Sequence, residues 1–131
     1  MFLQLLNHED KEKFLELIYK IANADGEFAE EEQEIVDSYK KELGILKIED
    51  TSDIEGLIEY FSDKVMEIRK IVYFETIGLI NADEKIENTE NEIIEKMEQA
   101  FQLEKTTVKM IECVAKKLQE VYDEVYDVLF D

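Results

Sequence analysis

Apolar residues recur every three or four positions along most of this chain, which is the spacing of one buried face of an α-helix. Gly44 follows the second periodic stretch, and glycine commonly ends a helix. Ser52 and Ser62 precede the next two stretches, and we expect them to act as N-terminal caps. The pattern predicts helices over residues of about 9–24, 30–43, 54–61, 63–82, 89–101 and 106–129.

The fourth predicted helix is apolar on nearly every side. Between residues 71 and 80, Glu75 and Thr76 are the only polar residues. A helix of this kind is normally the buried centre of a bundle, so we expect other helices to surround it. Glu75 is then either a buried acid or a marker of the exposed edge of this helix.

The last predicted helix has an apolar stripe whose members are separated alternately by three and four residues. A stripe of this kind usually packs on a core, and we interpret it as the face that covers the rest of the fold. A seam for self-association is the alternative. The stripe consists of Val108, Ile111, Ala115, Leu118, Tyr122, Val125 and Leu129.

One stretch of the chain recurs 58 residues later. Ile21–Phe28 aligns with Leu79–Ile86, and the match continues without a gap to Ile45 and Leu103. The sequence therefore predicts two copies of one helix–turn–helix unit, over residues of about 14–45 and 72–103. The identical pairs are Asn23/Asn81, Ala24/Ala82, Asp25/Asp83, Glu32/Glu90, Glu34/Glu92 and Ile35/Ile93.

Composition agrees with the helical pattern. The chain has 131 residues, of which 45% are hydrophobic, and it contains four glycines and no proline. This length fits one domain spanning residues 1–131, and the scarcity of helix-breaking residues favours helices throughout. The predicted fold class is all-α: a compact helical bundle of two helix–turn–helix repeats with additional helices.

The net charge of −19 limits the possible partners. Nucleic acids and anionic membranes are negatively charged, so binding to either is disfavoured. Cations and proteins with a basic surface are favoured instead. No apolar run approaches the roughly 18 residues of a membrane span, and the N-terminus lacks the basic region of a secretory signal. The single cysteine, Cys113, also fits a reducing cytoplasm, where we expect the protein.

The repeated turn resembles the TerB-like family, which includes tellurite-resistance proteins. The resemblance is carried by Ala24–Phe28 with Glu32, and by Ala82 and Asp83 with Ile86 and Glu90. It implies an all-α fold of paired helices and a cytoplasmic role in stress response, without a settled enzymatic activity. It also implies a divalent-metal site, whose ligands by position are Asp25, Glu32, Asp83 and Glu90.

Two positions depart from the family pattern. Ala29 stands where a helix-capping serine is common, and Glu84 replaces the glycine that Gly26 provides in the first turn. Glycine accepts backbone conformations that other residues avoid. The second departure therefore changes the backbone geometry expected at the second half of the site.

The spacing of the acids has a physical meaning of its own. An Asp at the turn and a Glu seven residues later can face one point, so two such units can bring four carboxylates together. Oxygen ligands of this kind suit Ca²⁺ or Mg²⁺. The alternative is that these acids only cap turns and helix starts, and the residues leave both interpretations open. Ile21 and Leu79 occupy the first ligand position of an EF-hand, which argues against that motif.

These patterns indicate a non-enzymatic protein that binds a divalent cation through the four acids. The alternative is a metal-free module that presents an acidic surface to a basic protein. A metal-dependent hydrolase is a third class, but the sequence identifies no separate base, nucleophile or oxyanion donor for it.

Overall fold

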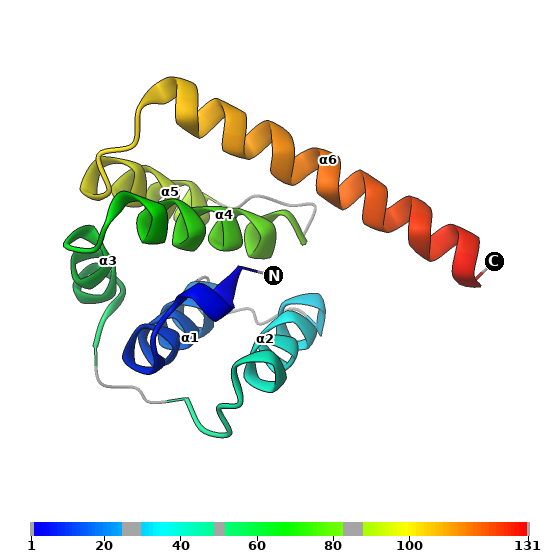
Figure 1. Ribbon diagram of the computed structural model, residues 1–131, viewed down its shortest axis with the longest axis horizontal. Helices are drawn as coiled ribbons and strands as arrows, with labels where there is room; N and C mark the ends of the chain where they lie inside the picture. The colour runs from blue at the N-terminus through cyan, green and yellow to red at the C-terminus, as the bar shows by residue number, and fades with distance from the viewer. Residues whose placement is uncertain (1, 25–29, 49–51, 83–87, 131) are drawn as a thin grey trace.

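The computed structural model describes residues 2–24, 30–48, 52–82 and 88–130, and every regular element within them is helical (Figure 1). The all-α prediction is thus confirmed for the described residues, and the helices lie within a few residues of their expected positions. In chain order the elements are the 3₁₀ turn η1 (Leu3–Leu5), α1 (His8–Ala22), α2 (Glu30–Leu43), α3 (Ile54–Ser62), α4 (Met66–Ala82), α5 (Asn88–Ala100) and α6 (Lys105–Phe130).

The two serines expected to cap helices have other roles. Asp53 caps α3, with its carboxylate oxygen 2.7 Å from the backbone nitrogen three residues later. Ser52 instead donates its backbone N–H to the buried Glu16 of α1 at 2.8 Å, which ties the start of α3 to α1. Ser62 is the last residue of α3, and its hydroxyl donates to the Glu59 carbonyl at 2.6 Å. Both cap predictions are wrong: Asp53 lies one residue closer to the start of α3 and caps it, and Ser62 ends α3, four residues before α4 begins.

The helices α2 and α5 end in the same way, 58 residues apart. Gly44 and Gln102 both adopt the left-handed conformation, with φ of 70° and 54°. The next residue then donates its N–H to the carbonyl five residues earlier, at 3.0 Å after α2 and 3.1 Å after α5. This is the Schellman pattern, which confirms Gly44 as the residue that ends α2. Arg69 of α4 also donates to the Phe101 carbonyl at 2.8 Å and holds the end of α5.

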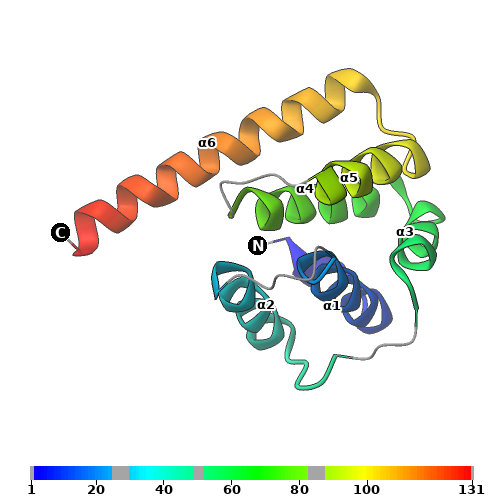
Figure 2. The same ribbon diagram turned by 180° about the vertical axis from the view of Figure 1, so that it is seen from behind.

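Helix α4 is the centre of the fold, as its apolar sequence predicts. It contacts each of the other five α-helices, and Figure 2 shows it between α1 and α2 on one side and α6 on the other. Val72, Tyr73 and Thr76 have no exposed surface, and Leu79 is 1% exposed. The core of the described residues is built around these side chains, which explains why α4 has almost no polar face.

Tyrosine hydroxyls connect helices across this core. Tyr60 of α3 donates to the buried Asp10 of α1 at 2.6 Å, and Lys64 contacts the same carboxylate at 3.2 Å. Tyr73 of α4 donates to Glu98 of α5 at 2.6 Å. A hydrogen bond to a charged group typically adds about 1.5–3 kcal/mol to the free energy of unfolding. Because it is directional, it also fixes the positions of the two helices that it joins.

Helix α6 covers the body of the protein with its first half only. Ala115 is 7% exposed, whereas Tyr122 and Leu129 are 49% and 67% exposed. We call residues 119–130, all of them exposed, the α6 arm; it extends beyond the other helices in Figure 1. The expectation that the stripe covers the fold along its whole length is therefore wrong. With 26 residues against 17, α6 is roughly 13 Å longer than α4, on which it packs.

Because the arm is exposed, removing it should change the stability of the body very little. Ending the chain after Leu118 is expected to lower the free energy of unfolding by about 1 kcal/mol or less, measured by urea denaturation of the monomer. The matched comparison is Met97→Ala, which empties a site with no exposed surface and should cost about 2–5 kcal/mol. Loss of cooperative unfolding on removal of the arm would show that the arm supports the core.

Candidate functional site

The predicted metal ligands fall only partly within the described residues. Outside these residues lie Asp25, Asp83, Ala29 and Glu84. Glu32 belongs to the first turn of α2, but its side chain is also outside the described part. Glu90 lies near the start of α5, and its side chain is 2% exposed. Within the described part, no three His, Cys, Asp or Glu side chains are grouped as a metal would require, so the site stays a prediction.

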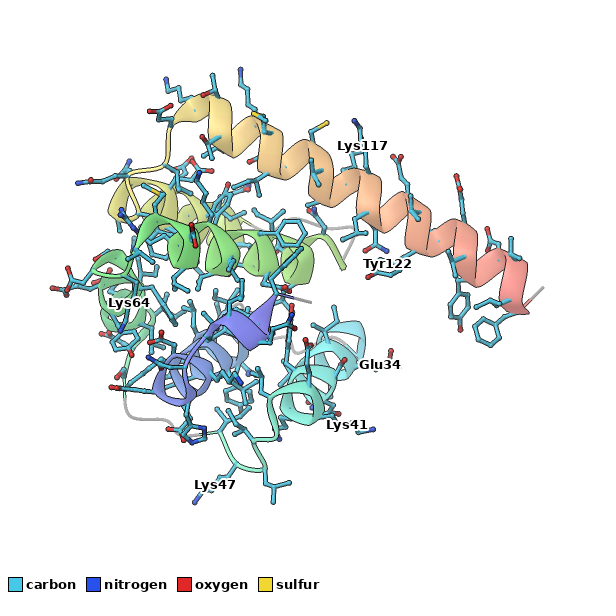
Figure 3. The ribbon with its side chains drawn as sticks, viewed as in Figure 1. Glu34, Lys41, Lys47, Lys64, Lys117 and Tyr122 are labelled. Carbon is cyan, nitrogen blue, oxygen red and sulfur yellow. The ribbon has the colours of Figure 1, made fainter. Side chains whose placement is uncertain are left out.

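A cleft of about 250 Å³ opens between α2, α4 and α6. Glu75 lines it with a carboxylate that is 8% exposed, in otherwise largely apolar surroundings. Figure 3 shows Tyr122 on the side of α6 that faces α2, where it forms one wall of the cleft. The remaining walls include Ile35 and Ser38 of α2, Phe74 and Gly78 of α4, and Leu118 of α6.

The carboxylate in this cleft is held in place by α2. The Tyr39 hydroxyl donates to Glu75 Oε2 at 2.5 Å, a short distance typical of a bond to a charged acceptor. The rings of Tyr39 and Phe14 of α1 pack in a T-shaped arrangement, with ring centres 5.3 Å apart and planes at 85°. The phenol therefore has little freedom to turn, and it fixes one oxygen of Glu75.

Burial raises the pKa of Tyr39, and the negative charge of Glu75 together with the hydrogen bond raises it further. Ionising this phenol would bury a second negative charge beside the first, which is costly in surroundings of low polarity. Tyr39 therefore remains a hydrogen-bond donor at neutral pH. The cleft consequently presents a carboxylate whose position is fixed and whose neighbours are mainly apolar.

A second groove, of about 520 Å³, lies between α4 and the first half of α6. Its lining is apolar except for Lys70 and Thr107 among the described residues. The apolar lining consists of Phe2, Ile71, Phe74, Met110, Ile111 and Val114. This groove suits an apolar surface, whereas the cleft beside Glu75 combines apolar walls with one charged group.

The sequence indicated part of this cleft. Glu75 was one of two polar residues in an apolar stretch, and its interpretation as a buried acid is confirmed. Tyr39 is recognisable as an inner-face residue of α2, but its hydrogen bond to Glu75 was not predicted. The sequence offered two indications of this bond, because Tyr39 lies on the apolar face of its helix and Glu75 lies in an apolar stretch. To pair the two residues, one must know that α2 packs beside α4.

Comparison of the chain with protein-family models, with curated proteins and with solved structures finds no match. The resemblance to the TerB-like family therefore rests on the residues of the repeated turn. None of the described helices combines the length and the apolar character needed to cross a membrane.

The burial of two tyrosines predicts how the protein titrates at alkaline pH. Tyr39 and Tyr73 have pKa values raised above 10.0, because both are buried and both donate to a carboxylate. Raised values mean that their contribution to stability is complete below pH 10 and is lost as pH rises further. Tyrosinate absorbance should show two of the six tyrosines ionising only when the helical circular dichroism is lost.

Tyr39→Phe should reduce this late fraction to one tyrosine while leaving the early fraction unchanged. Ionisation of all six tyrosines near pH 10, with the helices intact, would contradict the buried hydrogen bonds.

Proposed function

We propose that the protein is a non-enzymatic, cytoplasmic TerB-like protein whose cleft binds a basic segment of another protein. The observation that carries this proposal is the fixed carboxylate of Glu75 in a cleft with apolar and aromatic walls. The TerB-like part is supported by the repeated turn and by the identical helix ends at Gly44 and Gln102, 58 residues apart. The family resemblance makes stress response the physiological setting that we propose.

The size and lining of the cleft suit one long basic side chain. A volume of about 250 Å³ is smaller than the roughly 300–1,000 Å³ of small-molecule sites. Lysine and arginine have an apolar stem and a charged end, so the stem can lie along Leu118 and Phe74 while the charge reaches Glu75. The rings of Phe74 and Tyr122 add favourable contact with a cation. Each wall thus has a role in recognising such a side chain.

The charge of the whole chain favours the same kind of partner. A net charge of −19 attracts basic proteins over a distance and speeds their association, although it does not by itself select a site. The cleft supplies the selectivity, because there a fixed acid lies between apolar and aromatic walls. Binding should therefore weaken with added salt, yet remain specific for the residue that enters the cleft.

A peptide-binding measurement tests this function. A set of fluorescent peptides containing lysine or arginine between apolar residues is titrated by anisotropy against the protein, with glutamine-substituted peptides as the comparison. Basic peptides should bind more tightly, and Glu75→Gln should weaken their binding about tenfold by removing the charge. The amide oxygen of glutamine can still accept from Tyr39, so the fold should be retained.

Glu34→Gln is the matched control, because Glu34 is an exposed acid on α2 outside the cleft lining (Figure 3). It removes the same charge and should leave affinity nearly unchanged. Equal losses in the two variants would show that binding depends on diffuse charge and not on the cleft.

Divalent-cation binding through Asp25, Glu32, Asp83 and Glu90 is the second candidate function. It is favoured by the burial of Glu90, a carboxylate with 2% exposure at the position that aligns with Glu32. Carboxylate oxygens are ligands that suit Ca²⁺ or Mg²⁺, and the four acids occupy matching positions in the two repeats. Such a cation would link the two halves of the chain.

Thermal unfolding of the metal-stripped protein, with and without Ca²⁺ or Mg²⁺, tests this candidate. A cation present at 100 times its dissociation constant should stabilise the folded state by about 2.7 kcal/mol, which raises the melting temperature by several degrees. The combined variant Asp25→Asn with Asp83→Asn should abolish the rise. A rise that persists in this variant would indicate general screening of the negative charge.

A further inference from the structure

The apolar row that forms part of the cleft continues beyond it. Leu118 and Tyr122 line the cleft, and Val125 and Leu129 extend the same face of α6 at helical spacing. The last two side chains belong to the arm and are 46% and 67% exposed. Tyr122 is the residue at which the two parts meet (Figure 3). The cleft and the arm therefore share one continuous surface, which is recessed at one end and open at the other.

The open part of this surface has the length of a short helix. From Leu118 to Leu129 the row spans roughly 17 Å, at 1.5 Å per residue, and a helix of three turns covers that distance. A helix bonds its own backbone groups, whereas an extended segment laid on this apolar face would turn some of its N–H and C=O groups toward side chains that cannot bond them. The surface therefore suits an amphipathic helix.

The charges beside the apolar row select the sign of the partner. Glu124 lies one helical turn from the exposed Val121 and Val128, so its carboxylate borders the apolar face. The arm contains no basic residue, and the arm of a second copy would bring only further acids to it. A helix with lysine or arginine beside its apolar face is complementary instead. The acids of the arm are Glu120, Asp123, Glu124 and Asp127.

We propose that the cleft and the α6 arm together form the docking surface for a basic amphipathic helix of a partner protein. One basic residue of the partner enters the cleft and reaches Glu75. The helix beside that residue packs its apolar face on Val125 and Leu129, and its other basic residues lie beside the acids of the arm. This inference rests on the function proposed for the cleft, and it adds the conformation, the length and the charge pattern of the partner segment.

Short and long peptides, compared by anisotropy, test this proposal. The short peptide has one lysine between apolar residues, as in the test of the cleft. Two long peptides add three helical turns, with lysines beside an apolar row, either before or after that lysine. One of them should bind at least about tenfold more tightly than the short peptide, because it also buries Val125 and Leu129. Proline at the centre of the added turns should remove this gain, because it interrupts a helix.

Two alanine variants show where the added turns bind. Val125→Ala with Leu129→Ala should remove the gain of the long peptide and leave the affinity of the short peptide unchanged. The matched control is Met110→Ala with Val114→Ala, which shortens exposed side chains of α6 that line the other groove. This control should leave both affinities unchanged. Circular dichroism confirms that each variant stays helical.

A pair of charge variants tests the sign of the partner. Glu120→Gln with Glu124→Gln should weaken the long peptide about fivefold and leave the short peptide unchanged, because only the long peptide brings lysines to the arm. Glu92→Gln with Glu95→Gln removes the same charge from exposed positions of α5 and should have little effect. Equal weakening by both pairs would show that diffuse charge produces the gain, which overturns the proposal.

The remaining outcomes separate this inference from the function of the cleft. Equal affinity of the short and long peptides would overturn the inference and leave the cleft function intact, whereas failure of the short peptide to bind would overturn both. A gain that survives the proline, or the loss of Val125 and Leu129, overturns a helix on the arm. Sedimentation equilibrium of the chain alone supplies the last test, because a dimer that is lost with Val125 and Leu129 would assign the arm to a second copy.

Discussion

Every other α-helix of the described chain packs on α4, and the burial of this one helix governs the rest of the structure. A buried helix can carry polar groups only where neighbouring helices supply partners. Tyr73 donates to Glu98 of α5, and Glu75 accepts from Tyr39 of α2. These bonds fix how α2 and α5 lie against α4, which the non-directional packing of apolar residues does less well.

The cleft and the arm both arise from the way α6 meets α4. The first half of α6 lies on the apolar surface of α4, and contact ends after Ala115 because α6 is the longer helix. Beyond this point α6 leaves the body and forms a wall opposite α2, with Glu75 between them. A single difference in helix length thus produces a recessed surface beside Glu75 and an exposed apolar surface on the arm.

These two surfaces have different chemistry, which suits different parts of a partner. The cleft has one fixed carboxylate and is small, so it favours a single basic side chain over a second apolar helix. The arm has an exposed apolar stripe, and its charged residues are four acids. In an acidic protein, the contact proposed at the cleft brings positive charge beside a buried acid.

Local residue patterns determined the helices, the central place of α4 and the end of α2 at Gly44, because apolar spacing and backbone preference act within a few residues. For Glu75 the sequence left two alternatives, a buried acid or an exposed edge, and the structure decided for burial. Tertiary structure alone decided that Tyr39 bonds to Glu75, since these residues are 36 positions apart. Tertiary structure also decided where α6 stops being covered. The apolar spacing of the stripe is the same from Val108 to Leu129, and the contact between α6 and α4 ends where α4 ends.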